Sequence, residues 1–396
     1  MQESRNDTLS AEWQLMLGCV RNQIADEPIS DRLIQELSNL SDDRFLKLVR
    51  RHRVTPLVCA SLVGLRDTGV TVPIIDQLAR RQLSIARKNQ RLVQELCQIV
   101  TLLKDQKIQV WPFKGPVLAK DVYGGLHRRQ FIDLDLLITP DDLVPTLEVL
   151  QSLGYRNADA AVENLSGKRL RQFLRRFKSH TVIHPGGRSS VDVHWRLSED
   201  AGLFSLPFEE LIASPTTCHV GGIDFPTMPA DVAVQYLAFH ACKHGCTRLS
   251  WLCDFAMAAR KIRPEDWNST LQELPQQSSR MVAAALMMLE NLSLTAPLDQ
   301  HIDQFETWRS TLEVPVSMMM DALYSDDEKY INGTNVGLLR WKLSGNFRYF
   351  VDSLFRAVLP KQDDLAEAGI LKPHLSRWNH LASVVSGCGR RPPEDL

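Results

Sequence analysis

The chain has 396 residues, of which 44% are hydrophobic and 23% charged, and this length and composition suit a globular protein with two or three cored domains. The formal net charge of −1 gives no electrostatic footprint for nucleic acid as a partner of the whole protein. The start of the chain has no signal peptide, no apolar run is long enough to cross a bilayer, and the cysteines lie mostly in apolar helical patterns, so we expect reduced thiols and a cytoplasmic protein.

The first hundred residues show the spacing of helices. Ser30 and Ser41 each precede apolar residues at intervals of three and four, and serine is a favoured N-cap. The pattern breaks at 54–57 and resumes from Ile74 to Leu103. A basic run at 79–88 within the second stretch is interpreted as a solvated helix face.

A predicted strand from Ile108 to Phe113 leads through a Lys114-Gly115 turn into a predicted helix. Pro116 suits the first helical position, and the glycines at 124 and 125 suit the helix end. Backbone amides at a helix start favour phosphate, and Lys114 would add a positive charge for a triphosphate. The alternative interpretation is a simple strand-to-helix turn that binds nothing.

Two aspartates stand two residues apart in the next predicted strand, Phe131 to Ile138. Because side chains alternate between the faces of a strand, Asp133 and Asp135 point the same way, with apolar residues on the opposite face. Two like charges held side by side are costly unless a positive charge lies between them. A pair of magnesium ions would meet that need and is a known device for phosphoryl transfer.

A basic segment and a hairpin come next. Residues 166–178 are rich in lysine and arginine, which fits either a helix with one solvated basic face or an entrance that attracts an anionic nucleotide or acceptor. The segments from Ser179 to His184 and from Ser190 to Trp195 flank a Pro-Gly-Gly turn and are predicted to form a β-hairpin. Asp192 and His194 share one face of the second strand.

From Pro229 onward the sequence is helical again. His240, Lys243 and His244 share one side of a helix, and a continuing helix would add Asp254. Two cysteines in the same segment permit a zinc site, but at about a hundred degrees per residue they face away from the histidines, which disfavours zinc. The histidines form either a buried, hydrogen-bonded pair or a wall that contacts the acceptor or the base. We expect a wall that lines a cleft opposite the two aspartates.

The remainder of the chain, from about 265 to 396, shows helical patterns and little chemistry. Met318 to Leu323 is predicted to lie in a core, and Phe347 to Leu359 is predicted to form a helix. Residues 387–396, with two adjacent prolines, are predicted to be a disordered tail.

The segments KGPVLAKDVYGG, IDLDLLI and VDVHW, with Arg129 between the first two, resemble a family of bacterial proteins known only as uncharacterised nucleotidyltransferases. A glycine-led turn followed by an apolar-Asp-apolar-Asp strand also resembles the wider fold of DNA polymerase beta and the aminoglycoside nucleotidyltransferases. Two departures affect the phosphate contacts and the local backbone: Lys114-Gly115 replaces the Gly-Ser of the superfamily, and Ile132 stands where the family often has glycine.

The resemblance implies an α+β fold in which a small mixed nucleotidyltransferase sheet with helices is flanked by N- and C-terminal helical domains. The implied regions are an N-terminal helical region at 1–104, a catalytic core at 105–228, a C-terminal helical domain at 229–386 and the tail at 387–396.

The activity implied by the resemblance is magnesium-dependent transfer of a nucleoside monophosphate from an NTP, such as ATP, to a hydroxyl acceptor, with release of pyrophosphate. The expected site residues are Asp133, Asp135 and Asp192 as ligands of two magnesium ions, Lys114, Gly115 and Arg129 for the nucleotide, and His194, His240, Lys243, His244 and Asp254 for the acceptor or base. The acceptor is expected to be a small molecule or a peptide, and the near-neutral charge disfavours nucleic acid.

Two other functions are open. One is a catalytically silent nucleotide-binding or regulatory module on the same fold. The presence of all three carboxylates argues against this alternative. The other alternative is a metal-dependent phosphodiesterase. It is weaker, because such an enzyme needs a His/Asp metal cluster and His240 and Asp254 do not have the spacing of the usual one.

Overall fold

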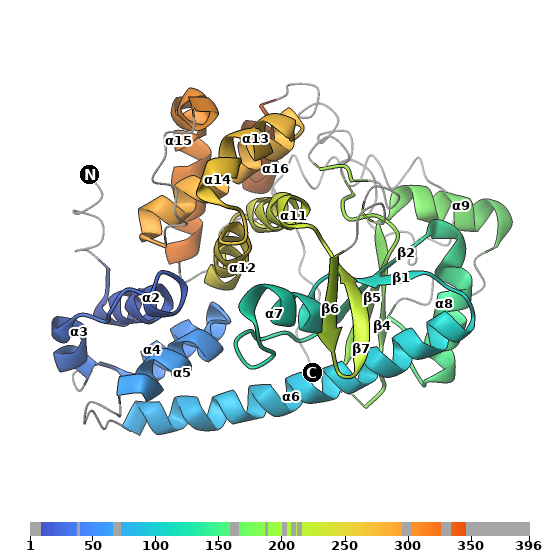
Figure 1. Cartoon of the computed structure of the whole chain (residues 1–396), viewed down its shortest axis with the longest axis horizontal. Helices are drawn as coiled ribbons and strands as arrows, with labels where there is room; N and C mark the ends of the chain where they lie inside the picture. Colours follow the sequence, from blue (N-terminus) through green and yellow to red (C-terminus); the bar gives the residue numbers. More distant parts are fainter. Residues whose placement is uncertain are drawn as a thin grey trace, which may run out of the picture.

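The structure, a computed structural model, describes residues 9–37, 40–65, 73–158, 166–186, 189–199, 204–206, 211, 216–294, 303–325 and 334–345. Figure 1 shows helices gathered on one side of the molecule and a small sheet on the other, with one long helix running beneath both. The chain therefore has the mixed α+β fold that the resemblance implied.

The N-terminal part consists of the helices α2 (Ala11–Ile24), α3 (Asp31–Glu36), α4 (Asp42–Arg51) and α5 (Thr55–Gly64). Ser41 caps α4 as predicted, because its hydroxyl accepts a hydrogen bond from the amide of Arg44. Ser30 stands at the N-cap of α3, but its side chain makes no capping hydrogen bond. The break predicted at 54–57 is the junction of α4 and α5, where Pro56 fits the first turn of the new helix.

Helix α6 (Pro73–Asp105) is the long helix along the lower edge of Figure 1. Its first turns place Ile74 and Leu78 in the hydrophobic core shared with the N- and C-terminal helices. Its last turns place Leu92 and Leu103 in a second core, beneath the sheet. One helix therefore contributes to both cores and fixes the position of one relative to the other.

The central sheet has five strands in the order β1-β2-β5-β4-β3, among the described residues. The strands are β1 (Val110–Pro112), β2 (Leu134–Ile138), β3 (Arg156–Asn157), β4 (Ser179–Ile183) and β5 (Ser190–His194). Strand β2 pairs in parallel with β5, and the other neighbours pair antiparallel. Strands β1, β2 and β5, which carry or lead to the predicted site residues, are therefore adjacent, although β1 and β2 are shorter than the segments predicted. Asp133 lies just before β2 rather than within it.

Helices pack around the sheet. Helix α7 (Gly115–Tyr123) follows β1 and ends at Gly124, whose left-handed φ of 73° is typical of a helix end. The remaining elements of this region are α8 (Leu143–Ser152), α9 (Gly167–Arg176), and a separate hairpin of β6 (Thr216–Val220) and β7 (Ile223–Thr227). In α9 the aromatic ring of Phe173 is buried while most of the basic side chains are exposed or half-buried.

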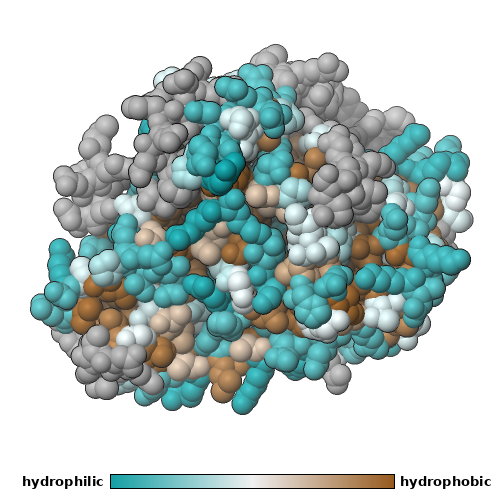
Figure 2. Space-filling model, viewed as in Figure 1, coloured by the Kyte–Doolittle hydropathy of each residue, from teal (hydrophilic) through white to brown (hydrophobic). Residues whose placement is uncertain are grey.

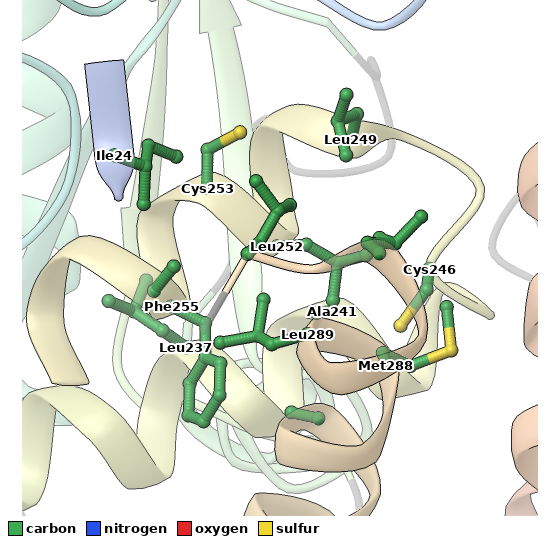
Figure 3. Close-up of a cluster of buried hydrophobic side chains, with 14 of the residues drawn as sticks. Ile24, Leu237, Ala241, Cys246, Leu249, Leu252, Cys253, Phe255, Met288 and Leu289 are labelled. Carbon is green, nitrogen blue, oxygen red and sulfur yellow. The ribbon is translucent and has the colours of Figure 1, made fainter. Parts of the chain in front are cut away.

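The C-terminal part is made of the helices α11 (Ala230–Lys243), α12 (Leu249–Ala259), α13 (Trp267–Glu273), α14 (Gln276–Leu292), α15 (Asp303–Tyr324) and α16 (Thr334–Ser344). Figure 3 shows how α11, α12 and α14 converge in the first core: the cluster includes Leu237 and Ala241, Leu252 and Phe255, and Met288 and Leu289. The core predicted at Met318 to Leu323 is confirmed, since its apolar side chains are buried or half-buried and Asp321 is exposed.

The helix predicted at Phe347 to Leu359 and the tail predicted at 387–396 lie outside the described residues. Within the described part of the chain, no helix combines the length and the apolar character needed to cross a membrane. The face shown in Figure 2 is largely hydrophilic, with hydrophobic residues gathered in its lower half.

Candidate active site

The two strands at the centre of the sheet bring two carboxylates together. Asp135 on β2 and Asp192 on β5 are direct partners in the parallel register. Their neighbours Leu134 and Val191 are also partners and are buried on the opposite face. The alternation of apolar and acidic residues thus seals one face of the sheet and sets the carboxylates on the other.

Asp135 is held by two positive or hydrogen-bonding groups. The ammonium of Lys114 donates to its Oδ1 at 2.9 Å, and the Nε2 atom of His194 lies 3.2 Å from the same oxygen. Burial alone would raise the pKa of Asp135, but the Lys114 charge and the His194 hydrogen bond lower that pKa well below its usual range. Asp135 is therefore a carboxylate at neutral pH although it is only 6% exposed.

Asp133 has the opposite electrostatic environment. Burial and the charge of Asp135 raise the pKa of Asp133. The positive charges of Lys114 and Arg53 oppose this rise. The two aspartates of the motif are thus not equivalent, since one is held ionised by direct partners and the other is crowded by like charge.

Gly115 sets the distance between the start of α7 and the aspartate loop. Its φ is +53°, a left-handed value that glycine adopts readily. A Cβ atom at this position would lie 3.3 Å from the backbone oxygen of Asp133, closer than most such contacts. Gly115, for which a phosphate contact is predicted, therefore lets the helix start approach the loop that carries Asp133.

The carboxylates fit a divalent cation. One ligand atom from each of Asp135, Asp192 and His194 lies within 4.8 Å of the others. The hydroxyl of Thr181 donates to Asp192 Oδ1 at 2.6 Å, and Lys114 and His194 contact Asp135 Oδ1. The described side-chain hydrogen bonds of the two aspartates therefore use Oδ1, and each Oδ2 stays available to a cation. Carboxylate oxygens suit magnesium or manganese. His194, predicted for the acceptor wall, is instead a neighbour of Asp135 within this cluster.

Arg129 and Asp254, predicted for the nucleotide and for the acceptor wall, bind each other. The guanidinium donates two hydrogen bonds of 2.7 Å to the two carboxylate oxygens, and the hydroxyl of Tyr123 donates a third of 2.7 Å. The Asp254 side chain is 3% exposed and that of Arg129 14% exposed, so this is a largely buried ion pair. It joins the loop before β2 to helix α12. The Arg129 guanidinium and the Asp254 carboxylate, predicted to contact the nucleotide and the acceptor, thus contact each other.

The predicted histidine wall is an aromatic row. The ammonium of Lys114 lies 5.7 Å from the ring centroid of Tyr236, and the Tyr236 and His240 rings stack at 6.0 Å. His240 contacts the ring of His244 at 5.1 Å and that of Trp251 at 5.6 Å. Helix α11 ends at Lys243, and the chain turns at 244–247 before α12. The row therefore begins beside the Asp135 ion pair and continues across the break between the two helices.

The two cysteines of the same segment point elsewhere, as helical geometry predicted. Cys242 Sγ lies 3.7 Å from the carbonyl oxygen of Met281, and Cys246 Sγ lies 3.5 Å from Met319 Sδ. Both cysteines are fully buried in the first core. Their sulfur atoms are therefore core groups, separate from the histidine rings.

Three lysines influence one another beside the carboxylates. Burial and the charge of Lys114 lower the pKa of Lys178. Burial and the charges of Lys178 and Lys114 lower the pKa of Lys243 to about 7. Tyr236 was missed by the sequence analysis, and Lys178 was considered there only as part of the basic segment 166–178 that could attract an anionic nucleotide or acceptor. Tyr236 could have been found, since it lies one helical turn before His240, whereas Lys178 is hidden in a basic run.

Comparison with known proteins assigns the chain to a family. A family model described as an uncharacterised nucleotidyltransferase matches residues 38–293, well over half of the 396 residues. No curated protein and no solved structure gives a significant match. The matched range contains the whole five-stranded sheet, the three aspartates and the helices α11 and α12. The chain therefore belongs to the uncharacterised nucleotidyltransferase family that its motifs resemble.

Proposed function

We propose that the protein is a metal-dependent nucleotidyltransferase that transfers a nucleoside monophosphate from an NTP to a hydroxyl acceptor and releases pyrophosphate. The observation that supports this most is the parallel register of β2 and β5, which makes Asp135 and Asp192 direct neighbours. Asp133 stands just before the strand and close to the glycine at the start of α7. A set of carboxylates beside a helix start is what metal-assisted phosphoryl transfer requires.

Asp133, Asp135 and Asp192 would hold the metal, for which we propose two magnesium ions. Bound magnesium would neutralise charge on the triphosphate and lower the pKa of the acceptor hydroxyl. His194 and Thr181 orient the carboxylates through their hydrogen bonds to Asp135 and Asp192.

The nucleotide is proposed to bind between α7 and the lysine cluster. The amides that start α7 at Gly115 face anions favourably, and Lys178 and Lys243 supply positive charge that no carboxylate binds among the described contacts. Lys114 is occupied by Asp135, so we assign it to holding that carboxylate as well as to the nucleotide. Arg129 is assigned to positioning, because its Nε and Nη2 atoms both donate to the carboxylate of Asp254.

Lys243 gives this assignment a pH dependence. Its pKa of about 7 arises from burial and from the charges of Lys178, Lys114 and Arg340, and the charge of Glu199 opposes this lowering. The ammonium form is lost as the pH rises, so NTP affinity should fall between about pH 6 and about pH 8.5. Lys243→Met should weaken NTP binding by about tenfold or more at pH 6, since a charged hydrogen bond is lost.

Titration of the protein with a fluorescent ATP analogue and magnesium at several pH values checks this prediction. Lys243→Arg is the matched control, because arginine keeps its charge and should flatten the profile while the titration of the nucleotide itself is unchanged. A Lys243→Arg profile identical to that of the wild type would show that another group titrates.

Radioactive NTPs test the activity. Each NTP, labelled at the α-phosphate in one reaction and at the γ-phosphate in another, is incubated with the protein, magnesium and a cell extract. Nucleotidyl transfer attaches the α-label to an acceptor and releases the γ-label as pyrophosphate. Transfer of the γ-label would indicate a kinase, and NTP binding without any transfer would indicate a silent module.

A further inference from the structure

A cavity of about 240 Å³ lies at the far end of the aromatic row, and the nucleotide assignment does not use it. The cavity is lined by Arg51, His244, Thr247, Arg248 and Trp251. Its walls come from the end of α4, the turn between α11 and α12, and the first turn of α12. A volume of this size holds one end of a small molecule rather than a whole nucleotide.

His52 fixes the two walls of the cavity to each other. Its Nδ1 atom accepts a hydrogen bond of 3.1 Å from the amide of Leu249, and its carbonyl oxygen accepts one of 3.1 Å from the amide of Ser250. The imidazole is buried, and burial with the nearby Arg51 and Arg248 lowers the pKa of His52 to about 3. A neutral imidazole is the form that can accept from an amide, so the contact persists at physiological pH.

The lining is cationic and aromatic. Arg248 lies over the indole of Trp251, with 5.4 Å between the guanidinium carbon and the ring centroid. The ring of His244 stacks on the same indole at 5.0 Å with an interplanar angle of 30°. Two of the lining residues are arginines and none is acidic. Such a surface attracts a planar or apolar group that carries a carboxylate or phosphate and repels a polycation.

The same segment of chain reaches the catalytic carboxylates. Arg53, two residues beyond Arg51, is close enough for its charge to act on Asp133. From the cavity, the aromatic row leads back through His244 and His240 to Tyr236, beside the Lys114–Asp135 pair. The cavity and the carboxylates are therefore connected in two ways, along residues 51–53 between α4 and α5 and along the aromatic row of α11.

We propose that this cavity binds the anionic end of the acceptor. On the proposed function, Arg51 and Arg248 hold the carboxylate or phosphate of a small molecule and Trp251 stacks against its planar part. The acceptor hydroxyl is then directed along the row of rings toward Asp133. This chemistry selects an acidic acceptor and rejects a polycationic one such as an aminoglycoside.

Binding of simple probes tests the cavity without turnover. Isothermal titration compares phenyl phosphate and 4-hydroxybenzoate with benzyl alcohol and benzylamine, which keep the ring but are neutral and cationic. We expect the two anions to bind at least tenfold more tightly than the neutral and cationic probes. Arg248→Met should remove that preference, Arg248→Lys should keep part of it, and thermal melting verifies that both variants fold.

Two controls locate the probe. Arg263→Met removes an arginine that is 71% exposed and is not among the residues that line the cavity, and it should leave binding of the probes unchanged. Magnesium-ATP should not compete with phenyl phosphate, because the nucleotide is assigned to the lysine cluster. Competition, or equal binding of anion and cation, or an unchanged Arg248→Met, would overturn the proposal.

The outcome is separable from that of the proposed function. Anion binding that depends on Arg248, in a protein that transfers no label, would keep the cavity assignment and refute the enzyme. Label transfer to a neutral or cationic acceptor would keep the enzyme and refute the cavity assignment.

Discussion

Asp135→Asn is expected to abolish nucleotidyl transfer and to lower the stability of the metal-free protein, whereas Asp133→Asn should abolish transfer and raise that stability. Either variant should lose roughly a thousandfold or more in rate, which corresponds to about 4 kcal/mol of transition-state stabilisation. The opposite effects on stability follow from the different partners of the two carboxylates. Asp135 neutralises Lys114 at 2.9 Å, whereas Asp133 is crowded by Asp135 and Asp192.

The effects of the two substitutions on stability should depend on pH, and the direction differs between Asp135 and Asp133. The lowered pKa of Asp135 means that its contribution is present above the pKa of the unfolded chain and is lost as the pH falls through the folded value. The raised pKa of Asp133 means that its ionisation destabilises the fold, so the benefit of Asp133→Asn appears only above its normal pKa. The Asp133→Asn difference should therefore shrink as the pH falls from about 7 to about 4, whereas the Asp135→Asn difference should persist down to about pH 4 and shrink only below it.

Thermal melting in the presence of a chelator, repeated with magnesium, measures these effects. Removal of one partner of a buried pair costs about 3 kcal/mol, less whatever the asparagine oxygen recovers by accepting from Lys114. Wild-type magnesium stabilisation in either variant would show that the substituted aspartate is not a metal ligand. Equal melting shifts of the same sign in both variants would contradict the assigned partners.

Asp254→Asn should have the largest effect on stability of any single substitution outside the core. The change leaves the Arg129 guanidinium in a largely buried site without its counter-charge, which costs about 3–5 kcal/mol. For a protein of this size each kcal/mol lowers the melting temperature by about 2–4 °C. Transfer should also fall by about tenfold or more, because a shift of about 1 Å in the loop before Asp133 misplaces a metal ligand.

Paired substitutions separate charge from packing. The double variant Arg129→Met, Asp254→Asn should recover part of the stability of Asp254→Asn, since no unpaired charge is left. The exposed pair of Arg263 and Asp266, also linked through two hydrogen bonds, is the control, and its removal should leave the melting temperature nearly unchanged. A double variant less stable than Asp254→Asn would show that the two residues act independently.

Much of the five-stranded sheet could be predicted, because its strands and turns have signals within short stretches of sequence. The two-residue period of β2 and β5 showed which side chains share a face, and the turn between β4 and β5 could be read from Pro-Gly-Gly. The resemblance implied a small mixed sheet, whereas the parallel pairing of β2 with β5 was not predicted from the sequence. The β6–β7 hairpin was not predicted, although it turns at Gly221 and Gly222, a pair of glycines typical of such a turn.

The contact between Arg129 and Asp254 could not be recognised from local pattern. Arg129 and Asp254 are separated by 125 positions, and a sequence offers no sign that two charged residues so far apart meet. Any arginine near a triphosphate motif would have been read as a phosphate ligand. His194 was placed on the correct face, but its contact with Asp135 depends on the register between strands.

The Arg129–Asp254 pair also constrains how these two positions can evolve. Neither residue can be replaced alone without leaving a buried charge, so single mutations at either position pass through a destabilised intermediate. In homologous chains the two positions should therefore covary, appearing together as arginine and aspartate or changing together to an uncharged pair. Such covariation would show that the loop before β2, which carries Arg129 and Asp133, and helix α12 evolve together.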